Sequence, residues 1–544
     1  MQAIGAFGLY VVVSVVLFGL PVLSDPSRTF IGPPASPDPR FFFWALAWWP
    51  HAPIHGLNPI WTHAVWAPEG YNLAWATGAP GPSLLVSPIT LTAGPVVAYN
   101  VLALLACPLS GLAAFLLCRR VTGAFWPSLA GGYVFGFSTY QLGHLGQHVN
   151  LELSFLVPLA VYLVLLRVDG DIGARRFVVL LTVVLVFEFL TSTEVFATLA
   201  VFGGLTLLLA LAFAPERRTD VLAAGRLIAL SLLLVAIVVS PYLWYAFAHE
   251  VPRRGLDGSD LLSLFVPRLR TLIGSKTFFS LTRTFPGAAR EDTAYLGLPL
   301  IAILIHFAVT QWRRRVTKLL VVAMFLFALA ALGPRLFVAG HASVPLPWRA
   351  VQALPLINNA APRRFSVYVF VIAAVAVATW LSAGRRSWAR WGAVLAAVVF
   401  LFPNFSPDYL HGSADVPRFF ATGGYRRFVH PGDNVLILPS DAPSGFPQAI
   451  SMLIQARADF SFRMGLAYTG PPPPEYERSP ILRALYRGRA PSVGAVEFMQ
   501  FLAAHRIRAI ILDRGSALEP GLTALLGGPP DPVADVLVYE VPPR

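Results

Sequence analysis

The stretch GAFGLYVVVSVVLFGLPVL occupies residues 5–23, and SPDPR follows it at residues 36–40. The first stretch is apolar and close to the ~20 residues that a helix needs to cross the hydrocarbon core of a bilayer. Of the 544 residues, 56% are hydrophobic and only 13% are charged, and the mean hydropathy is +0.64. Soluble domains carry about 25% charged residues. The sequence therefore predicts an α-helical polytopic membrane protein.

We expect about eleven transmembrane helices in this chain. They are placed at about residues 5–23, 82–118, 126–140, 151–167, 177–192, 195–214, 227–247, 293–311, 319–333, 365–383 and 391–403. Pro88 and Pro95 divide the region 82–118 into a short interfacial piece and a full span. The first span has no basic n-region and no A-x-A site, so we interpret it as a retained helix rather than a cleaved signal peptide.

The basic residues indicate the orientation of these spans. Short arginine-rich loops fall on one side if there are eleven spans, and the positive-inside rule makes that side, with the N-terminus, cytoplasmic. The membrane domain then covers residues 1–403, with large outer loops at 24–80, 248–292 and 334–364. The net charge of +13 is part of this topology signal, and no nucleic-acid-binding module is visible. Arg-, Ala-, Pro- and Gly-rich composition is typical of a GC-rich bacterial genome, which predicts a bacterial plasma membrane.

The tail, residues 404–544, changes character and lies outside in this topology. Its expected strands are Asn434–Pro439, Ile507–Asp513 and Asp535–Val541, and its expected helices are Pro447–Ala458 and Ala495–His505. Alternating helices and strands predict a small extracytoplasmic α/β domain.

Asp38 stands between two prolines soon after the first span. Pro-Asp-Pro is favourable turn chemistry, and this structural interpretation stays open. The functional interpretation is a carboxylate at the outer membrane face that acts as a general base on an acceptor hydroxyl.

The rest of the first outer loop mixes aromatic rings with hydrogen-bonding groups. Tryptophans gather at membrane interfaces for amphipathic reasons alone. Aromatic faces among Asn, His and Glu side chains also suit a sugar. The residues are Trp44, Trp48, Trp49, His51, His55, Asn58, Trp61, His63, Trp66, Glu69, Tyr71 and Asn72. The three histidines match no closed metal-ligand spacing, so we expect no metal and no other cofactor, with a divalent metal as the alternative.

Further polar groups lie at the outer ends of the predicted spans. Gln141, His144, Gln147, His148, Asn150 and Glu152 cluster between the third and fourth spans, and Glu188 and Glu194 flank the next outer turn. Charged groups at these positions are functional candidates. The pair Glu291 and Asp292 either caps the eighth span or acts in catalysis. Arg363 and Arg364 begin the tenth span at a helix N-terminus, where an anion can bind. Arg253, Arg254 and Arg268 could join them, and headgroup snorkelling is the alternative.

Taken together, these features resemble the GT-C glycosyltransferases, integral membrane enzymes that take sugar from a polyprenyl-phosphate carrier. The supporting stretches are Pro37–Arg40, Trp66–Gly70, Tyr295–Gly297 and the α/β tail, and the details look closest to bacterial YfhO-like members. The resemblance implies that Asp38 is the catalytic base and that outer arginines hold the lipid phosphate. It leaves the second acidic residue open among Glu152, Glu194 and Asp292.

The sequence thus predicts a membrane glycosyltransferase that moves a sugar from a polyprenyl-phosphate carrier to an envelope glycan, lipid or protein. The substrate-binding candidates are Arg40, Arg253, Arg254, Arg363, Arg364, His51, His55, Trp66, Glu69, His144, His148 and Tyr295. No nucleotide-binding glycine motif is present, which suits a membrane-borne donor. A lipid or glycan transporter or flippase, and a non-catalytic envelope-assembly protein, are the alternatives.

Overall fold

The structure is a computed structural model of the chain. It describes residues 1–248, 256–267, 270–274, 276–287, 291, 293–352, 357–383, 387–406, 410–439, 447, 449–470 and 472–542.

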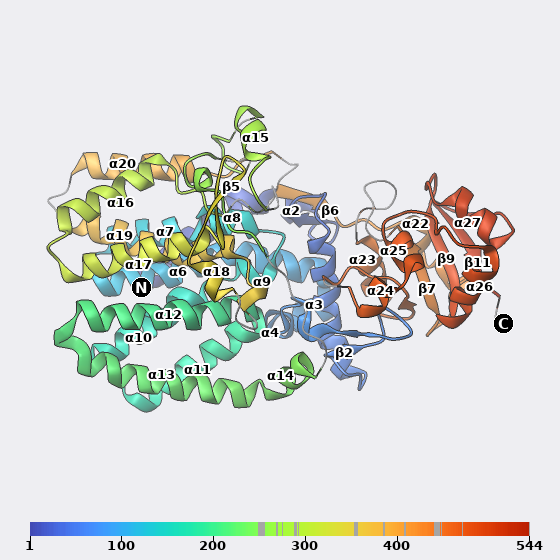
Figure 1. Ribbon diagram of the computed structural model, residues 1–544, viewed down its shortest axis with the longest axis horizontal. Coiled ribbons are helices and arrows are strands. Elements are labelled where there is room, and N and C mark those ends of the chain that lie inside the picture. Colours follow the sequence, from blue (N-terminus) through green and yellow to red (C-terminus); the bar gives the residue numbers. More distant parts are fainter. Residues whose placement is uncertain are drawn as a thin grey trace. The chain divides into compact units, whose positions relative to one another are not determined.

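The chain divides into two compact units. Unit 1 comprises residues 1–23, 101–240 and 252–410, and unit 2 comprises residues 24–100, 241–251 and 411–544. Unit 1 is dominated by long helices, whereas strands β7, β9 and β11 belong to unit 2 (Figure 1). The break after residue 410 lies near the boundary predicted after residue 403, but the first long loop groups with the tail rather than with the spans.

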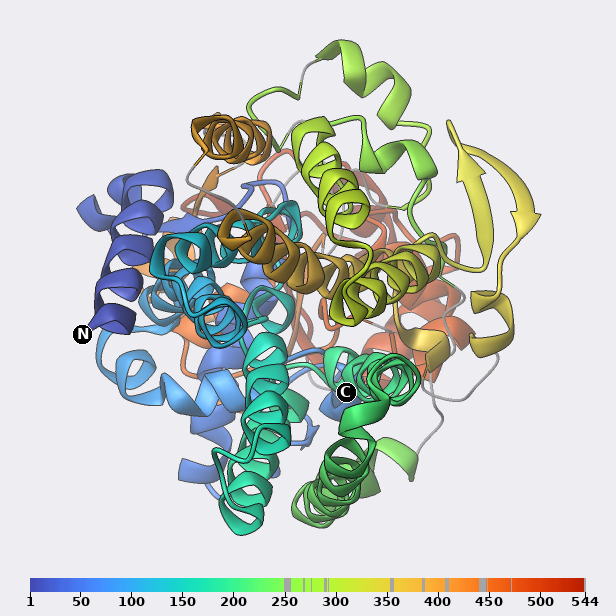
Figure 2. The same cartoon turned by 90° about the vertical axis from the view of Figure 1, so that its left-hand side faces the viewer.

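Helices occupy every segment predicted to span the membrane. They are α1 (Gln2–Ser14), α2 (Leu20–Ser24), α6 (Pro95–Thr122), α7 (Phe125–Gly136), α10 (Leu156–Val168), α11 (Ala174–Thr191), α12 (Thr193–Phe213), α13 (Arg218–Val238), α16 (Leu298–Gln311), α17 (Arg315–Ala331), α19 (Ser366–Ser382) and α20 (Trp388–Leu401). A π-helical turn, η1 (Val15–Gly19), joins α1 to α2. Figure 2 shows several of these helices close to end-on.

Six helices in the described part of the chain are long and apolar enough to cross a membrane. They are Gln2–Ser24, Pro95–Thr122, Val149–Val168, Thr193–Phe213, Pro215–Val238 and Pro362–Ser382. The structure therefore supports a multi-pass membrane protein, while the number of eleven crossings stays a prediction.

Helix α19 forms the centre of unit 1, with 89% of its apolar window buried. It packs against α7, and this contact depends on glycine. A Cβ atom at Gly131 would lie only 2.7 Å from the carbonyl oxygen of Ala374 and from the Sγ atom of Cys118. Small residues let two helix backbones approach closely in the absence of water, so the sequence of α7 determines how near it comes to α19.

Ion pairs connect the predicted cytoplasmic loops at one end of the bundle. Asp169 follows α10. Its Oδ2 atom lies 2.7 Å from Nη2 of Arg120 in α6, and its Oδ1 atom lies 2.9 Å from Nη2 of Arg217 before α13. Arg315 at the start of α17 binds Glu216. These contacts confirm that four basic loops lie at the same end of unit 1. The fifth loop falls partly outside the described residues, and the membrane side of this end stays a prediction.

Short elements complete unit 1. They are α8 (Thr139–His144), α9 (Val149–Glu152), η3 (Pro215–Arg217), η4 (Leu261–Leu264), α15 (Lys276–Thr282), β4 (Arg335–Val338), β5 (His341–Pro345), α18 (Trp348–Val351), η5 (Ile357–Asn359) and η6 (Pro362–Phe365). Strands β4 and β5 pair antiparallel. Helix α14 (Ser240–Phe247) crosses from unit 1 into unit 2.

The core of unit 2 combines the first loop with the tail. Within the expected loop, α3 (Asp38–Ile54) packs against α23 (Ile450–Arg457) of the tail. The indole N–H of Trp44 donates to the Oε1 atom of Gln455 at 2.7 Å, and Trp48 stacks on Trp44 at 5.4 Å. Strand β1 (Thr29–Ile31) also pairs with β6 (His411–Ser413).

This core corrects both interpretations of three first-loop tryptophans, the membrane interface and the sugar-binding face. Trp44, Trp48 and Trp66 are only 0%, 2% and 3% exposed. Burial of such a ring removes roughly 150–250 Å² from solvent, so these tryptophans contribute to the hydrophobic core of unit 2.

A five-stranded mixed sheet lies in the tail, in the order β10-β11-β9-β7-β8. Strand β7 (Asn434–Leu438) is parallel to β9 (Ile507–Asp513), and β9 is antiparallel to β11 (Val536–Glu540). These are the three strands predicted from sequence, and α26 (Ala495–Ala504) is the predicted amphipathic helix. The apolar runs are buried on both faces, which explains why they were recognisable.

The remaining elements of unit 2 are short. They are β2 (Trp61–Thr62), β3 (Tyr71–Asn72), η2 (Leu73–Trp75), α4 (Pro80–Leu85), α5 (Ser87–Ala93), α22 (Arg418–Ala421), η7 (Gly424–Arg427), β8 (Arg463–Met464), α24 (Pro474–Arg478), α25 (Pro480–Tyr486), α27 (Glu519–Leu526) and β10 (Asp531–Val533). The short helices α4 and α5, followed by α6 from Pro95, confirm the predicted division of the region 82–118.

Candidate functional site

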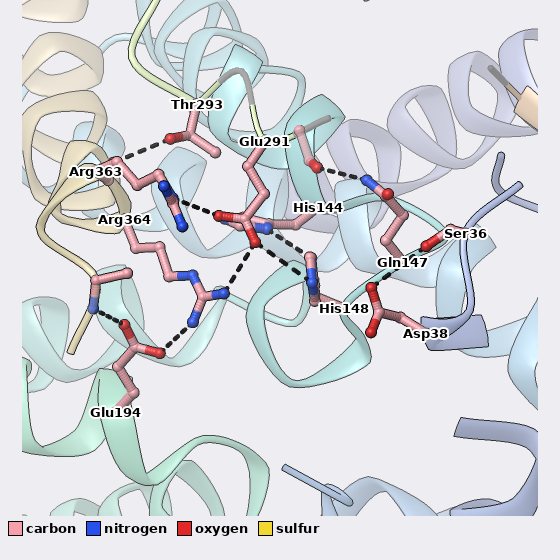
Figure 3. Close-up of polar contacts among 12 residues, drawn as sticks. Ser36, Asp38, His144, Gln147, His148, Glu194, Glu291, Thr293, Arg363 and Arg364 are labelled. Atoms are coloured by element: carbon pink, nitrogen blue, oxygen red, sulfur yellow. Dashed lines mark hydrogen bonds and ion pairs between the residues drawn. The ribbon is translucent and has the colours of Figure 1, made fainter. Parts of the chain in front are cut away.

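Four charged side chains form a network in unit 1 (Figure 3). Glu194 lies in the first turn of α12, and Glu291 lies in the segment before α16. Arg363 and Arg364 belong to η6, immediately before α19. Helix α12 begins next to Glu194 and ends just before Arg217, which belongs to one of the basic loops. The network therefore lies at the opposite end of the bundle from the basic loops. We call these four residues the Glu–Arg network.

The Glu–Arg network is held by short charge-assisted hydrogen bonds. Arg364 donates from Nη1 to Glu194 Oε2 at 2.5 Å and from Nη2 to Glu291 Oε1 at 3.0 Å. Arg363 donates from Nε to Glu291 Oε2 at 2.7 Å. The backbone N–H of Ala361 donates to Glu194 Oε1 at 2.7 Å. Each carboxylate is thus bound to at least one guanidinium, and the four formal charges sum to zero.

Two histidines extend the network. His148 Nε2 lies 3.5 Å from Glu291 Oε1, and His148 Nδ1 lies 3.2 Å from His144 Nδ1. His144 is fully buried, with its ring edge-to-face against Tyr140 at 4.7 Å. Burial and the neighbouring His148 hold the pKa of His144 well below its usual range. His144 is therefore neutral at physiological pH.

The neighbours of Glu291 determine its ionisation. Burial alone would raise the pKa of this carboxyl group, but electrostatic interactions with Arg364, His148 and Arg363 hold its pKa well below the usual range. Glu291 is consequently an anion at neutral pH and a weak base. It is better suited to positioning the arginines than to removing a proton.

One ligand atom each from His144, His148 and Glu291 lies within 4.8 Å of the other two, so these residues could hold a metal ion. A divalent cation there would lie beside Arg363 and Arg364 and would compete with them for the carboxylate of Glu291. Like charges repel strongly in a partly buried setting. The arrangement suits an anion better than a metal ion.

Glu152 faces the interior of the loop between α8 and α9. It is fully buried, and its Oε2 atom accepts the backbone N–H of Gly146 at 2.7 Å. Gln141 donates to the carbonyl oxygen of Glu152 at 2.8 Å. The predicted candidate Tyr295 is also buried, and its carbonyl oxygen accepts from Thr139 Oγ1 at 2.7 Å. Glu152 and Tyr295 are thus buried in unit 1, and the catalytic role of Glu152 and the binding role of Tyr295 stay predictions.

In unit 2, Asp38 begins helix α3. Ser36 Oγ donates to its Oδ2 atom at 3.3 Å, and Tyr468 Oη donates to its Oδ1 atom at 3.0 Å. Pro39 at the first helical turn fits the start of a helix, because proline lacks an N–H that would be unsatisfied there. Asp38 is therefore a helix-start residue whose carboxylate is oriented by two hydroxyl groups.

Arg40 stabilises the segment that leads into Asp38. It is 3% exposed and donates from Nη1 to the carbonyl oxygen of Ser36 at 3.2 Å. Its guanidinium carbon lies 5.9 Å from the ring centroid of Phe30. Burial lowers the pKa of Arg40 to about 10. The expected phosphate-binding role does not fit this buried position, because the guanidinium contacts protein backbone and a ring.

The remaining first-loop candidates lie in three places in unit 2. Trp66 donates its indole N–H to Thr469 Oγ1 at 2.9 Å within the aromatic core. Glu69 is 43% exposed and its Oε1 atom lies 4.0 Å from the Nε2 atom of His505. His51 and His55 stack on each other at the end of α3, at a centroid distance of 3.9 Å. Arg253, Arg254 and Asp292 lie outside the described residues, as does Arg268.

The tail residues that contact the first loop were not predictable from the sequence. Tyr468, which binds Asp38, and Gln455, which binds Trp44, carry no motif. Glu291 was predicted, together with Asp292, either to cap the eighth span or to act in catalysis, and its contact with two arginines could not be predicted from sequence spacing. Only charge complementarity between outer helix ends pointed towards the Glu–Arg network.

The comparisons with known proteins extend these observations. A family model described as a domain of unknown function (DUF6311) matches residues 7–402. The chain belongs to the DUF6311 family. No curated protein matches the sequence. The predicted YfhO-like placement stays a prediction.

Solved structures show the fold. The arabinofuranosyltransferase AftD from Mycobacteria is similar at 15% identity and a TM-score of 0.62, over 99% of this chain and 40% of AftD. The Archaeoglobus fulgidus oligosaccharyltransferase in the apo form is similar at 13% identity and a TM-score of 0.52, over 94% of this chain and 69% of that enzyme. The archaeal enzyme AglB in complex with an inhibitory peptide and a dolichol-phosphate gives 14% identity, a TM-score of 0.50 and the same coverage. This DUF6311 chain therefore has the GT-C fold, and it spans about 40% of the length of AftD.

Proposed function

We propose that this DUF6311 protein is a glycosyltransferase that moves a sugar from a polyprenyl-phosphate carrier to an acceptor of the bacterial cell envelope. The observation that supports this most strongly is the similarity of 99% of the chain to AftD at a TM-score of 0.62. The complex of AglB with a dolichol-phosphate supports a lipid-phosphate ligand for this fold. The acceptor is a glycan, a lipid or a protein.

Asp38 is the proposed general base. In an inverting transfer, the acceptor oxygen attacks the anomeric carbon while Asp38 takes the proton of the acceptor hydroxyl. The bond from the anomeric carbon to the phosphate oxygen breaks, and the lipid phosphate leaves with the electron pair. A positioned base contributes typically 10²–10⁴-fold to such a step. The hydrogen bonds from Ser36 and Tyr468 support this role, because they fix the direction of the carboxylate.

The Glu–Arg network is the proposed binding site for the anionic lipid phosphate. Arg363 uses its Nε–H for Glu291, and a guanidinium carries further donors on its two Nη nitrogens. Glu194 and Glu291 hold the two guanidinium groups in fixed directions, which reduces the entropy lost when an anion binds. Donors that face the leaving phosphate stabilise the negative charge that grows there.

The function is tested with the purified protein in liposomes that contain total polyprenyl lipids from a strain lacking this gene. We expect the wild-type protein to release polyprenyl phosphate, detected by mass spectrometry, and to attach the sugar to material in an envelope extract. In the deletion strain, one lipid-linked sugar should accumulate. Movement of a lipid-linked sugar between leaflets without release of polyprenyl phosphate would instead identify a flippase and refute the proposal.

A further inference from the structure

A second histidine cluster lies in unit 2, separate from the residues proposed for transfer. His51 is in the last turn of α3, and His55 follows the end of this helix. Asp459 follows α23 in the tail. One ligand atom from each of these three residues lies within 4.8 Å of the other two.

We propose that His51, His55 and Asp459 form a binding site for a first-row transition-metal ion, with Zn²⁺ as the natural ligand. Two imidazole nitrogens and one carboxylate oxygen are a ligand set that zinc accepts, and a water molecule completes a four-coordinate site. Imidazole ligands disfavour calcium and magnesium, which prefer oxygen. The proposal does not depend on the glycosyltransferase function.

The hydrogen bond of His55 selects the ring nitrogen that can bind the metal. Its Nδ1 atom lies 2.9 Å from the carbonyl oxygen of His51. A carbonyl oxygen can only accept, so Nδ1 carries the proton and Nε2 carries the lone pair. Metal-binding histidines generally show such a hydrogen bond from the other ring nitrogen to a carbonyl or carboxylate. His55 therefore has the tautomer that a ligand needs.

His51 and Asp459 already share a polar contact that a metal ion can replace. His51 Nδ1 lies 3.1 Å from Asp459 Oδ1. Two ligands of one tetrahedral zinc ion, each about 2.0–2.2 Å from the metal, are separated by roughly 3.3 Å. Binding shifts the imidazole proton from Nδ1 to Nε2, so that Nδ1 and the carboxylate face the ion. The side chain of Asp459 is 82% exposed and can turn towards it.

The backbone after α23 holds the carboxylate beside the histidines. Asp459 and the next residue, Phe460, both have left-handed backbone angles, with φ values of 50° and 54°. Residues other than glycine rarely adopt this conformation, because it brings the Cβ atom too close to the following carbonyl oxygen. The ring of Phe460 packs on His51 at 4.5 Å and on Trp48 at 5.3 Å, and these contacts offset the strain. Two strained residues thus place the third ligand.

Only part of this site was predictable from the sequence. His51, His55 and His63 were considered together, and their spacing fits no closed motif. In the structure, His63 Nδ1 contacts the carbonyl oxygen of Pro68, and Asp459 supplies the third ligand from the tail. A bound metal would join the end of α3 to the turn after α23 inside unit 2. Because α3 begins at Asp38, the ion would limit the motion of the helix that carries the proposed base.

The test measures Co²⁺ and Zn²⁺ binding to the full chain in detergent after chelator treatment, with any polyhistidine tag removed. We expect one Co²⁺ ion per chain with the visible absorption of a tetrahedral site, displaced by Zn²⁺, and a higher thermal midpoint with Zn²⁺. His55→Ala and Asp459→Asn should weaken binding at least tenfold and abolish the thermal shift. Both side chains are exposed, so the variants should fold.

Two control variants separate this site from other histidines. His63→Ala removes an exposed histidine of the same unit, and His148→Gln disrupts the second histidine cluster in unit 1. Both should bind Co²⁺ as the wild-type protein does. Wild-type binding by His55→Ala and Asp459→Asn, loss of binding in His148→Gln, or no binding by the wild-type chain would each overturn the proposal.

Discussion

The two carboxylate-bearing regions differ in the partners of their carboxylates. In unit 1, Glu194 and Glu291 accept hydrogen bonds from guanidinium groups. In unit 2, Asp38 accepts hydrogen bonds from the hydroxyl groups of Ser36 and Tyr468. A carboxylate that is hydrogen-bonded to a guanidinium group orients that cation. It is also a poor proton acceptor, because the neighbouring positive charge stabilises its ionised form. The comparison therefore assigns anion binding to the Glu–Arg network and proton removal to Asp38.

Replacement of Asp38 tests the catalytic half of this comparison. We expect Asp38→Asn to lower kcat about 10²–10⁴-fold, because the amide cannot accept the proton. The amide keeps the size and can still accept a hydrogen bond through its oxygen, so the fold should remain. The measurement is release of polyprenyl phosphate from the donor. Asp25→Asn, in the same first loop, is the matched control and should retain wild-type activity. Full activity of a folded Asp38→Asn protein would exclude Asp38 as the base.

Replacement of Glu291 tests whether the ion pairs of the Glu–Arg network stabilise unit 1. Glu291→Gln removes the negative charge between Arg363 and Arg364, whose side chains are only 14% and 19% exposed. Loss of one partner from a buried ion pair typically costs about 3–5 kcal/mol, because a buried charge is left uncompensated. We expect a clearly lower thermal unfolding midpoint, followed by tryptophan fluorescence in detergent.

An exposed ion pair provides the control for Glu291→Gln. The Nε atom of Arg28 lies 3.2 Å from the Oδ1 atom of Asp415, and the two side chains are 68% and 61% exposed. Surface pairs contribute about 0–1 kcal/mol, so Asp415→Asn should hardly change the midpoint. Equal effects of the two substitutions would show that the Glu–Arg network is no more important for stability than a surface pair.

These two regions also show what the sequence could predict. The helices of unit 1 were recognisable because each is an apolar run. A run as long and apolar as residues 366–382 is typical of a membrane-spanning helix and of few other structures. Strands β7 and β9 were recognisable for the same reason. Glu194, Arg363 and Arg364 were candidates because charges at the ends of apolar helices are costly and uncommon.

The contacts between distant segments were not predictable. Trp44 and Gln455, and Asp38 and Tyr468, are separated by more than 400 residues and have no spacing rule that connects them. The tryptophans of the first loop were interpreted as membrane-interface or sugar-binding residues, because the same side chain suits an interface, a sugar face and a protein core. Only the tail residues that cover the rings decide between these two environments.

The pH dependence of stability sharpens the comparison further. The pKa of Glu291 is held well below its usual range by Arg364, His148 and Arg363, against the opposing effect of burial. A lowered pKa in the folded state gives stability that is present above the pKa of the unfolded state, about 4.3. This stability is lost as the pH falls below that value towards the folded pKa. Because Gln does not titrate, the difference in unfolding free energy between wild type and Glu291→Gln should shrink below pH ~4, by up to about 1.4 kcal/mol per pH unit. A difference that stays constant from pH 7 to pH 3.5 would contradict the lowered pKa.

The smallest expected effect concerns Tyr468, which orients Asp38 from the tail. Tyr468→Phe removes one hydrogen bond of about 1 kcal/mol, which corresponds to a roughly fivefold loss of kcat with KM unchanged. Tyr539→Phe is the matched control, since its hydroxyl group contacts Thr523 at 2.7 Å in the same unit. Both variants should lower the thermal midpoint by a similar amount, so that only the loss of kcat distinguishes them. Equal kcat values in the two variants would limit Tyr468 to a structural role and leave the orientation of Asp38 to Ser36 and the start of α3.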